Sequence, residues 1–483
     1  MMVITSHYHV CKLSFFPTEQ QSSPCLLLTI KTKGMGKTTK TKSNLQLAVI
    51  HPHTAAVDVG SMLMTVAFTD AEGQQLLMET DGFTESLNDL VKTLKAAGIT
   101  HVAMEATGVY WMALYELMED HGLTVTLVNP KHFKNVDAQK TDVKDSQWLQ
   151  QLHAHGLLRA SHIAPELYRE LRSYVHERNV LQKQKSDTLN RIHRILTKMN
   201  VKVQHLISDI EGVSGMRLLR GIAQGISDPE ELLSTINTER LKADKEDLLK
   251  SLKGVYKNQY VLILKNSLKT LDFFKHQMKE YELLVEAVLQ KMLPRDKEKK
   301  NPKISPKTYR ARKNQYSINL KDYFHQIIGV DLTKIDGLDE ISILEIISVT
   351  GIDMSKWKTA EHFASWLNLS PRPKITGGKI IGYSRRFTNN NATQALRMAA
   401  QTMWKNKGTL GKLYRRLAAQ KGSAKAIKAV ARKLAIILYN MIKNKSEFDP
   451  QKIQIDSERE KQKRISRLER EATRYGFTLQ KVA

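Results

Sequence analysis

Short apolar runs alternate with longer amphipathic segments between residues 54 and 130. Three runs, TAAVDVGS, LMTVAFTD and QQLLMET, have the length and turn-bounded pattern of β-strands. TESLNDLVKTLKAAG places apolar residues at helical spacing before a glycine stop, which predicts an amphipathic helix. THVAMEA, GVYWMALYELMEDHG and TVTLVNP then predict a strand, a helix and a strand. The resulting order, βββαβαβ, is typical of a mixed α/β sheet.

Strand signals disappear from residue 165 to about residue 294, where long helical stretches replace them. One stretch, 167–206, keeps apolar residues at heptad-like positions, interrupted by Arg178 and Lys185, and 261–288 shows a similar pattern. Two such helices predict an antiparallel hairpin or a coiled-coil arm that joins two subunits. A helical bundle that only spaces the outer domains is the alternative.

The C-terminal part reads as helical beyond a basic, proline-containing segment at residues 300–317. LTKIDGLDEISILEIISVTGID predicts two helices around a turn at Gly337 and a second glycine at Gly351, the pattern of a helix–hairpin–helix that presents backbone amides to phosphate. GTLGKLYRRLAAQKGSAKAIKAVARKLAIILYNMIK predicts a helical run with basic residues between its core positions. Such a surface is suited to contacts with a nucleic-acid backbone.

Charge is unevenly distributed along the chain. The 483 residues carry a formal net charge of +26, yet residues 51–160 contain 14 acidic and 7 basic side chains. Residues 362–446 contain 18 Lys or Arg and no acid, where average composition would place about ten acids. Excess positive charge of this size indicates a polyanionic partner, most commonly nucleic acid, whose phosphates it would contact. A surface charged only for solubility is the alternative.

Several other functions are disfavoured by the composition. Cys11 and Cys25 are the only cysteines, so a disulfide framework and a cysteine metal site are excluded. GMGKTT resembles a phosphate loop, but the first glycine of that motif would fall at Lys31. No apolar run reaches the roughly 20 residues of a membrane span, and LLLTI is too short for a secretory signal. We therefore expect a cytoplasmic protein with a basic, disordered lead, for which Met35 is an alternative start.

Four carboxylates are candidates for a metal site. Asp58 lies at the centre of an apolar strand, where a charged group must be paired, protonated or bound to a cation, and Glu105 ends the strand THVAM. Asp142 and Asp145 are three residues apart, so they share one face of a helix. Clustered carboxylates repel by about 4 kcal/mol per close pair at an effective dielectric near 20, which a hard, oxygen-preferring cation such as Mg²⁺ would offset. Each acid alone also reads as a salt-bridged or helix-start residue, and the nearby Asp137 is left out.

Several motifs occur in a fixed order between residues 50 and 445: AAVDVG, AMEATGVYW, LVNPKHFKN with KTDVKDS, WLNLSPRPKITGGK and NNNATQALRMAAQ. Their spacing and order resemble the DEDD insertion-sequence transposases, which are bridge-RNA-guided recombinases with a RuvC-like nuclease domain and a serine-type transposase domain. The resemblance implies that Asp58, Glu105, Asp142 and Asp145 hold Mg²⁺, or Mn²⁺ in its place.

The same resemblance implies a C-terminal serine that attacks the scissile phosphate and becomes covalently linked to DNA. The matching position is Thr376, which keeps the hydroxyl but adds a methyl group that stiffens and crowds it. Ser370 and Ser384 are alternative nucleophiles, and a simple basic turn is the alternative for the whole segment. The candidate nucleic-acid contacts around Thr376 are Arg372, Lys374, Gly377, Gly378, Lys379, Arg385, Arg386 and Arg397.

These observations together predict an α/β plus α protein. We expect a basic lead at 1–45, an RNase H-like (RuvC-like) nuclease domain at 50–162, a helical coiled-coil and basic linker at 163–325, a helical, basic transposase domain at 326–446 and a charged helical tail at 447–483.

The resemblance implies donor and target DNA and a structured guide RNA as partners. Because long helices separate the acidic and basic parts, we expect a composite site built across a homodimer or tetramer. We expect no membrane partner and a nucleoid-associated place in a bacterial cytoplasm. The rival hypotheses are an RNase H-like junction nuclease without a covalent intermediate and a non-enzymatic nucleic-acid packaging protein. An ATP-using protein of the same broad fold is disfavoured, because no second phosphate-binding glycine motif is evident.

Overall fold

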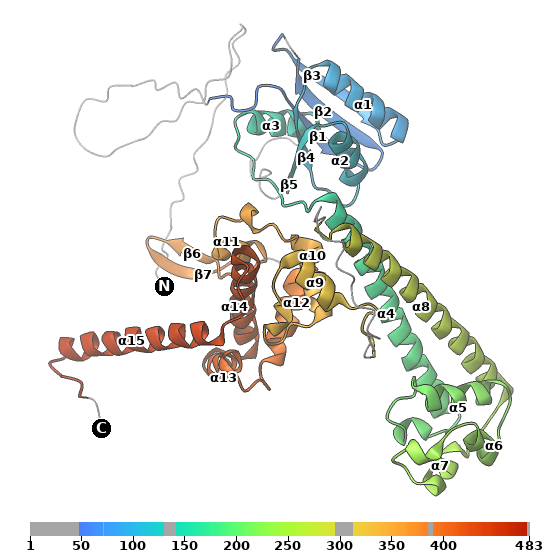
Figure 1. The fold of residues 1–483 in the computed structure, drawn as a ribbon. Helices are drawn as coiled ribbons and strands as arrows, with labels where there is room; N and C mark the ends of the chain where they lie inside the picture. The colour runs from blue at the N-terminus through green and yellow to red at the C-terminus, as the bar shows by residue number, and fades with distance from the viewer. Residues whose placement is uncertain (1–47, 71, 130–141, 295–312, 385–389, 481–483) are drawn as a thin grey trace, which may run out of the picture. The chain divides into compact units, whose positions relative to one another are not determined.

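The computed structural model describes residues 48–70, 72–129, 142–294, 313–384 and 390–480 (Figure 1). The predicted lead, including Cys11, Cys25, Lys31 and Met35, lies outside the described residues, as do Asp137, Arg385, Arg386 and most of the basic linker. The chain divides into two compact units, residues 1–163 and residues 164–483, which are described separately. Within the described part, no helix has the length and apolar character to cross a bilayer.

The first unit is built on a five-stranded mixed sheet with strand order β3-β2-β1-β4-β5. β1 pairs antiparallel with β2 and parallel with β4, while β2–β3 is antiparallel and β4–β5 is parallel. The element order is the predicted βββαβαβ followed by one more helix, which is consistent with an RNase H-like domain. The bounds are β1 Thr54–Val59, β2 Leu63–Thr69, β3 Gln75–Asp81, α1 Thr84–Ala96, β4 His101–Glu105, α2 Trp111–Asp120, β5 Thr124–Val128 and α3 Asp142–Ala154.

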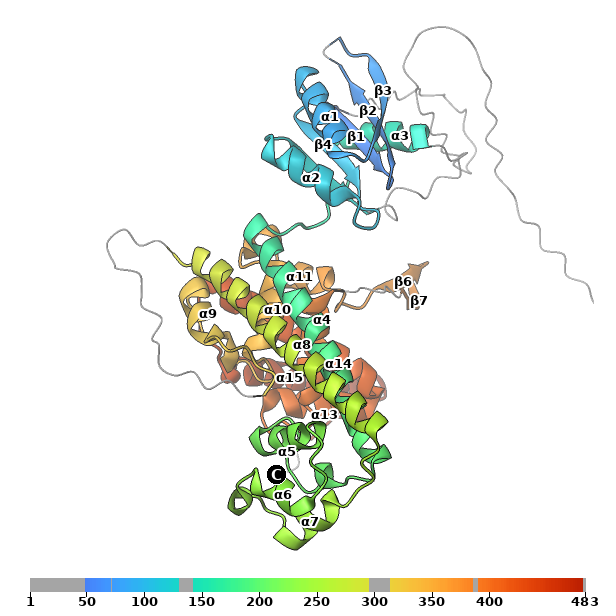
Figure 2. The same cartoon turned by 90° about the vertical axis from the view of Figure 1, so that its right-hand side faces the viewer.

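Helices cover both faces of this sheet (Figures 1 and 2). α1 and α2 pack on the face that carries Val57 and Met104, where the larger apolar cluster of the unit lies. α3 packs on the opposite face, where Leu149 is buried against Ala56 and Ala103. Small side chains in β1 and β4 therefore give α3 a site on this face of the sheet.

The buried side chain of Gln150 fixes the direction of α3 across the sheet. Its Nε2 donates to the Thr54 carbonyl (3.3 Å) and to Thr69 Oγ1 (2.6 Å), and its Oε1 accepts from Gln75 Nε2 (2.9 Å). Thr54 begins β1, Thr69 ends β2 and Gln75 begins β3. The second half of α3 thus lies at the end where β1 starts, and the helix runs antiparallel to β1.

Three imidazoles gather at this same end of the sheet. The ring centroids of His51 and His101 are 4.7 Å apart, those of His51 and His153 are 5.3 Å apart, and those of His101 and His153 are 6.4 Å apart. Burial, with smaller contributions from His51 and His101, lowers the pKa of His153 to about 4. Burial and His51 also lower the pKa of His101. Packing in this cluster therefore favours the neutral rings of His101 and His153.

Acid is expected to loosen α3 through this cluster. Because the pKa of His153 is about 4 in the folded protein and 6.5 otherwise, the folded form binds fewer protons, and stability is lost as the pH falls from 6.5 towards 4. Between pH 6.5 and pH 5 the loss should be about 2 kcal/mol. Hydrogen exchange of α3, corrected for intrinsic rates, should show this loss of stability in the wild type. The loss should be smaller in His153→Gln. His121→Gln, at an exposed position, is the matched control, and equal pH dependence in all three proteins would contradict the assignment.

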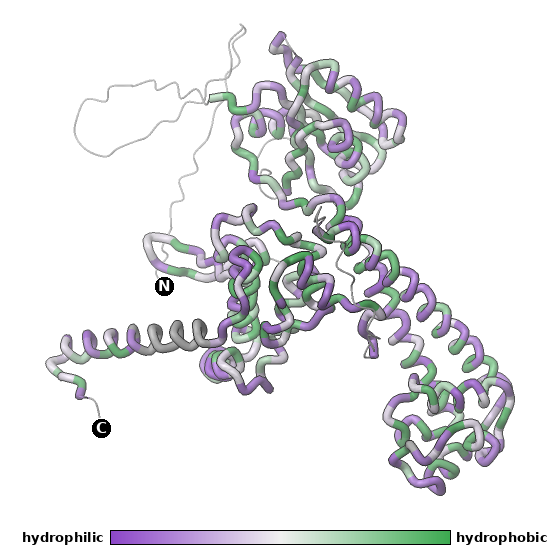
Figure 3. Tube along the Cα trace, in the orientation of Figure 1, coloured by the Kyte–Doolittle hydropathy of each residue, from purple (hydrophilic) through white to green (hydrophobic). Residues whose placement is uncertain are grey.

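The second unit begins with two long helices, α4 (Glu166–Lys198) and α8 (Asn258–Lys291), which lie side by side (Figure 1). Residues early in α4 pack with residues late in α8 and the reverse, so the pair is antiparallel. Hydrophobic and hydrophilic residues alternate along both helices (Figure 3). The chain between them forms a small helical tip with η2 Val203–His205, α5 Val213–Ala223, α6 Pro229–Ser234, η3 Thr238–Arg240 and α7 Lys245–Leu252.

The two cations that interrupt the apolar seam of α4 are buried and paired. Arg178 contacts Glu282 Oε1 through Nη2 (2.9 Å) and Nε (3.1 Å), and its guanidinium lies 4.2 Å from the Tyr316 ring centroid. Lys185 Nζ lies 3.1 Å from a carboxylate oxygen of Glu211. Arg178 also donates to the carbonyls of residues 314 and 315. The contacts of Arg178 therefore join α4, α8 and the segment that follows the predicted linker.

Removing one partner of the buried pair should destabilise the second unit strongly. Arg178→Met leaves the Glu282 carboxylate buried without its cation, which should cost about 3 to 5 kcal/mol. Arg220→Met, which breaks an ion pair with Asp272 whose side chains are 57% and 47% exposed, should cost less than about 1 kcal/mol. Urea denaturation of both variants checks this. Similar midpoints for the two variants would show that burial does not control the strength of these pairs.

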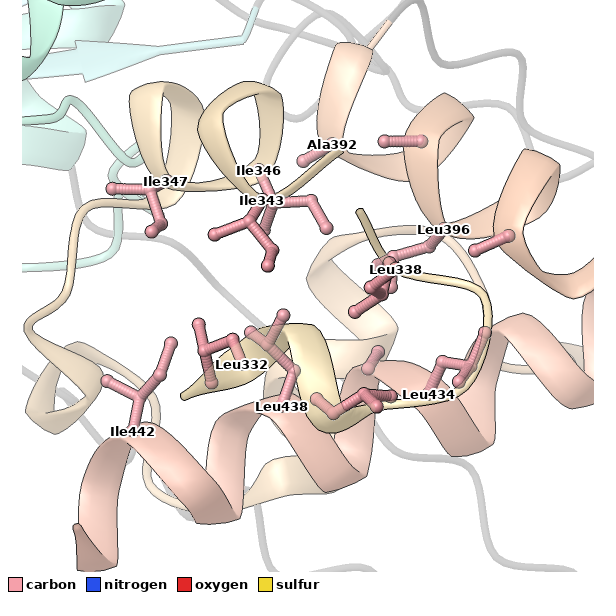
Figure 4. Close-up of a cluster of buried hydrophobic side chains, with 14 of the residues drawn as sticks. Leu332, Leu338, Ile343, Ile346, Ile347, Ala392, Leu396, Leu434, Leu438 and Ile442 are labelled. Atoms are coloured by element: carbon pink, nitrogen blue, oxygen red, sulfur yellow. The ribbon is translucent and has the colours of Figure 1, made fainter. Parts of the chain in front are cut away.

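The remainder of the second unit is a helical body around one apolar core, part of which is drawn in Figure 4. Leu338 and Ile343 meet Leu396 of α12 and Leu434 of α14 in this core. The bounds are α9 Leu320–Ile328, η4 Leu332–Lys334, α10 Glu340–Thr350, η5 Met354–Lys356, α11 Ala360–Trp366, β6 Pro373–Thr376, β7 Lys379–Tyr383, α12 Asn391–Thr402, α13 Thr409–Lys421, α14 Ser423–Asn444 and α15 Pro450–Arg474.

Three details of this unit differ from the prediction. The segment before Gly337 forms only a short 3-10 helix, and a Cβ at Gly337 would come within 2.4 Å of Met403, so this turn packs against α12. The single helical run predicted from Gly408 is two helices, broken at Gly422, whose φ of +82° is unfavourable for other residues. A β-hairpin, β6–β7, lies within the domain that was predicted to be helical.

Candidate functional site

Asp58 and Glu105 lie next to each other on adjacent parallel strands. The register pairs Val57 of β1 with Met104 of β4, so Asp58 and Glu105 follow side by side at the end of β4. Both have the same parity as Ala56 and Ala103, and their side chains therefore belong to the face that α3 covers. Glu105 is only 4% exposed and accepts a hydrogen bond from Thr107 Oγ1 (2.6 Å).

α3 brings a third carboxylate to this end of the sheet. Leu149 marks where the helix crosses Ala56 and Ala103. Asp145 lies one helical turn before Leu149, a rise of about 6 Å, and Asp58 and Glu105 lie two strand residues beyond the alanines, about 6 to 7 Å. Because α3 is antiparallel to β1, both displacements are in the same direction. Asp145 is therefore level with the two strand carboxylates.

Asp142 begins α3, one further turn along the same helix face, and its side chain lies outside the described part. Among the side chains that the structure does describe, no group of three or more His, Cys, Asp or Glu is gathered closely enough to hold a metal ion. Asp58 and Glu105 both have interaction partners. The register thus places Asp58 and Glu105 side by side and directs the start of α3 towards the same end of the sheet, and the metal site itself stays a prediction.

Exposed apolar side chains border this edge, a feature that the sequence reading missed. They lie in the turns that follow β1 and β3, at the first residue of β2, in the loop after β4 and in the first turn of α2, at the same end of the sheet as Asp58 and Glu105. The sequence did carry a signal for this exposed apolar surface, which was the presence of apolar residues in segments predicted as turns, because turn residues are usually polar. The residues are Met62, Leu63, Phe83, Val109, Tyr110 and Met112.

Thr376 lies at the tip of the β6–β7 hairpin, where the alternative reading was a simple basic turn. It pairs with Lys379 across two glycines, Gly377 and Gly378, whose φ values are +54° and +76°. Two successive positive φ angles define a type I′ turn, the connection that best suits the twist of a two-residue hairpin. The Thr376 side chain is exposed, so its hydroxyl is accessible.

The other residues predicted around Thr376 fall into three groups. Lys374 and Lys379 are exposed on the hairpin, and Arg397 is exposed on α12. Arg372 is half-buried at the base of the hairpin, where its carbonyl accepts from the Ser384 amide (2.9 Å). Arg385 and Arg386 lie outside the described residues. Lys374 and Lys379 thus place positive charge beside the hydroxyl.

Of the two alternative nucleophiles, Ser384 is exposed, whereas the Ser370 hydroxyl oxygen is buried with no hydrogen-bond partner among the described atoms. A buried hydroxyl is less accessible to a phosphate than that of Thr376. The geometry therefore favours Thr376 over Ser370 as the reactive hydroxyl.

Two family models match the chain. One, named for DEDD transposases of the IS110 type and described as a transposase, covers residues 55–201. The other, described as the transposase IS116/IS110/IS902 family, covers residues 331–415. The first range contains the four predicted carboxylates, and the second contains Thr376 and Arg397. No curated protein matches the chain.

Proposed function

This chain belongs to the IS116/IS110/IS902 family of transposases, and from that premise we propose that it cuts and rejoins DNA with two sets of side chains. One set is the carboxylates at the edge of the first unit, and the other is the hydroxyl of Thr376. The observation that carries the proposal is the strand and helix register, which supports a shared location for Asp58, Glu105 and Asp145. The family supplies the reaction class, which is strand cleavage and rejoining.

The carboxylates are proposed to hold Mg²⁺, or Mn²⁺ in its place. Their oxygen donors suit a hard divalent cation, and the Thr107 hydroxyl orients Glu105 towards one rotamer. The ligands would be Asp58, Glu105, Asp142 and Asp145. When bound, the cation would neutralise these carboxylates and polarise a phosphodiester oxygen.

Thr376 is proposed to act as the nucleophile. Its Oγ would lose its proton and form a bond to phosphorus, while one bridging P–O bond breaks and the released DNA oxygen takes up a proton. Attack by a second DNA hydroxyl on the same phosphorus would reverse the sequence, rejoin the strand and free Thr376. Lys374 and Lys379, beside the hydroxyl on the exposed hairpin, would stabilise the negative charge of the transition state.

The partners we propose are donor and target DNA and a structured RNA. The segment 362–446 carries 18 cationic side chains and no acid, a composition suited to phosphates rather than to base edges. Sequence choice would then come from base pairing with the RNA. The acidic and basic parts of the chemistry lie in different units of the chain, and we propose a homodimer or tetramer as the working form.

Loss of one strand carboxylate should abolish activity. Asp58→Asn removes a charged ligand at nearly constant volume, and excision of the intact element with its flanking DNA should fall by at least about 100-fold. Asp89→Asn is the matched control, because Asp89 is exposed on α1 and pairs only with Lys92 among the described ion pairs; it should retain wild-type excision. Excision near the wild-type level in Asp58→Asn would remove the carboxylates from the mechanism.

Changes at Thr376 should separate covalent catalysis from hydrolysis. Thr376→Ala should lose the SDS-stable protein–DNA adduct and strand transfer, whereas Thr376→Ser should keep both and raise the rate several-fold, because the crowding methyl is gone. Ser384→Ala serves as the control hydroxyl on the same segment. An adduct that persists in Thr376→Ala would assign the nucleophile elsewhere. Cleavage by the wild type without any adduct would favour the junction nuclease.

A further inference from the structure

The β6–β7 hairpin exposes large apolar side chains instead of burying them. Ile375, Ile380, Ile381 and Tyr383 are 62%, 57%, 69% and 62% exposed. The hairpin projects from the helical body (Figure 2), and a Cβ built at Gly377 would meet no atom within 4 Å. An isolated two-stranded hairpin with both faces in water is marginally stable. These side chains therefore form an apolar surface that the described part of the chain leaves exposed.

The strand register places the apolar residues one position from the candidate nucleophile, on the opposite face of the hairpin tip. Ile375 pairs directly with Ile380, and Thr376 pairs with Lys379. Because neighbouring residues of a strand point to opposite faces, the two isoleucines form one face of the tip, and Thr376 and Lys379 form the other. A ligand that covers the isoleucine pair is thus held beside residues that adjoin Thr376 in the chain, while the Thr376 hydroxyl lies on the opposite face of the tip.

The size and charge of the hairpin indicate which kind of partner fits. One face of strands this short spans roughly 15 by 10 Å, about 150 Å², whereas a stable protein interface needs about 800 Å² from each partner. The flanking Lys374 and Lys379 are exposed, and residues 362–446 contain no acid that could pair with them within the segment. A small apolar surface with cations on adjacent residues of the same hairpin matches duplex DNA, in which apolar bases lie between rows of phosphates.

We propose that Ile375 and Ile380 insert as a wedge between two base pairs beside the scissile phosphate. Inserted aliphatic side chains unstack a base step and kink the duplex, and they need no large footprint. Lys374 and Lys379 would contact the flanking phosphates, and the unstacked step would be presented to Thr376. The inference rests on the proposed function and adds the positioning residues through which the chain grips the cleaved step.

The test measures base unstacking without requiring cleavage. Protein carrying Thr376→Ala, purified with the RNA expressed from its intact element, would be bound to a duplex of the element end with 2-aminopurine scanned across the junction. We expect a fluorescence rise of several-fold at one step. Adding Ile375→Ser with Ile380→Ser should abolish the rise while DNA affinity changes by less than about threefold. Ile375→Met with Ile380→Met should restore it, because methionine is also apolar and long.

Leu262→Ser with Phe273→Ser is the matched control, since both side chains are exposed on α8 at 58% and 57%; it should leave the signal unchanged. An undiminished signal in the hairpin serine variant would overturn the wedge. If that variant kept the fluorescence signal but lost self-association in light scattering, the hairpin would be a contact between protein subunits. That result would also overturn the wedge.

Strand cleavage by the protein with Thr376 intact is scored separately. A wedge signal without any cleavage or adduct by this protein would contradict the proposed function and leave the wedge standing. Cleavage by this protein with no unstacking at any scanned step would contradict the wedge and leave the proposed function standing.

Discussion

The hydrogen bonds of Gln150 are the constraint on which the arrangement of the first unit depends. One buried amide joins the start of β1, the end of β2 and the start of β3, and so it anchors the second half of α3 at that end of the sheet. Because a helix is rigid, its first turns must then extend towards Asp58 and Glu105. With the opposite direction, Asp145 would be displaced from the strand carboxylates by most of the length of β1, roughly 15 to 20 Å.

Packing positions the elements of each unit by different means. In the first unit, Ala56 and Ala103 give α3 its site on the sheet, and Leu149 fixes its position along the strands. In the second unit, the Arg178–Glu282 pair ties both long helices to the segment that leads into the helical body. The carboxylates and the segment that leads into the helical body are thus each positioned within their own unit. The acidic first unit and the basic segment 362–446 carry opposite charge, as the proposed function requires of one part that would hold cations and another that would contact phosphates.

Local patterns predicted the strands and helices of the first unit, because strand alternation, helical spacing and stop signals all lie within short windows. The arrangement of the carboxylates depends on contacts far apart in the chain, such as Gln150 with Thr54, which periodicity does not reveal. The hairpin was missed because its isoleucines are exposed on short strands, although the Gly377–Gly378 pair between β-forming residues was a usable signal. The helix break at Gly422 was missed because apolar spacing continues across it.

The central claim is that Asp58, Glu105 and the first turns of α3 share one edge of the sheet and bind a divalent cation there. Anomalous diffraction from crystals of the full chain grown with Mn²⁺ tests this claim most directly. The account predicts an anomalous peak within about 2.5 Å of carboxylate oxygens from both β-strands and from α3. Carboxylates at opposite ends of the sheet, or manganese bound only elsewhere, would contradict it.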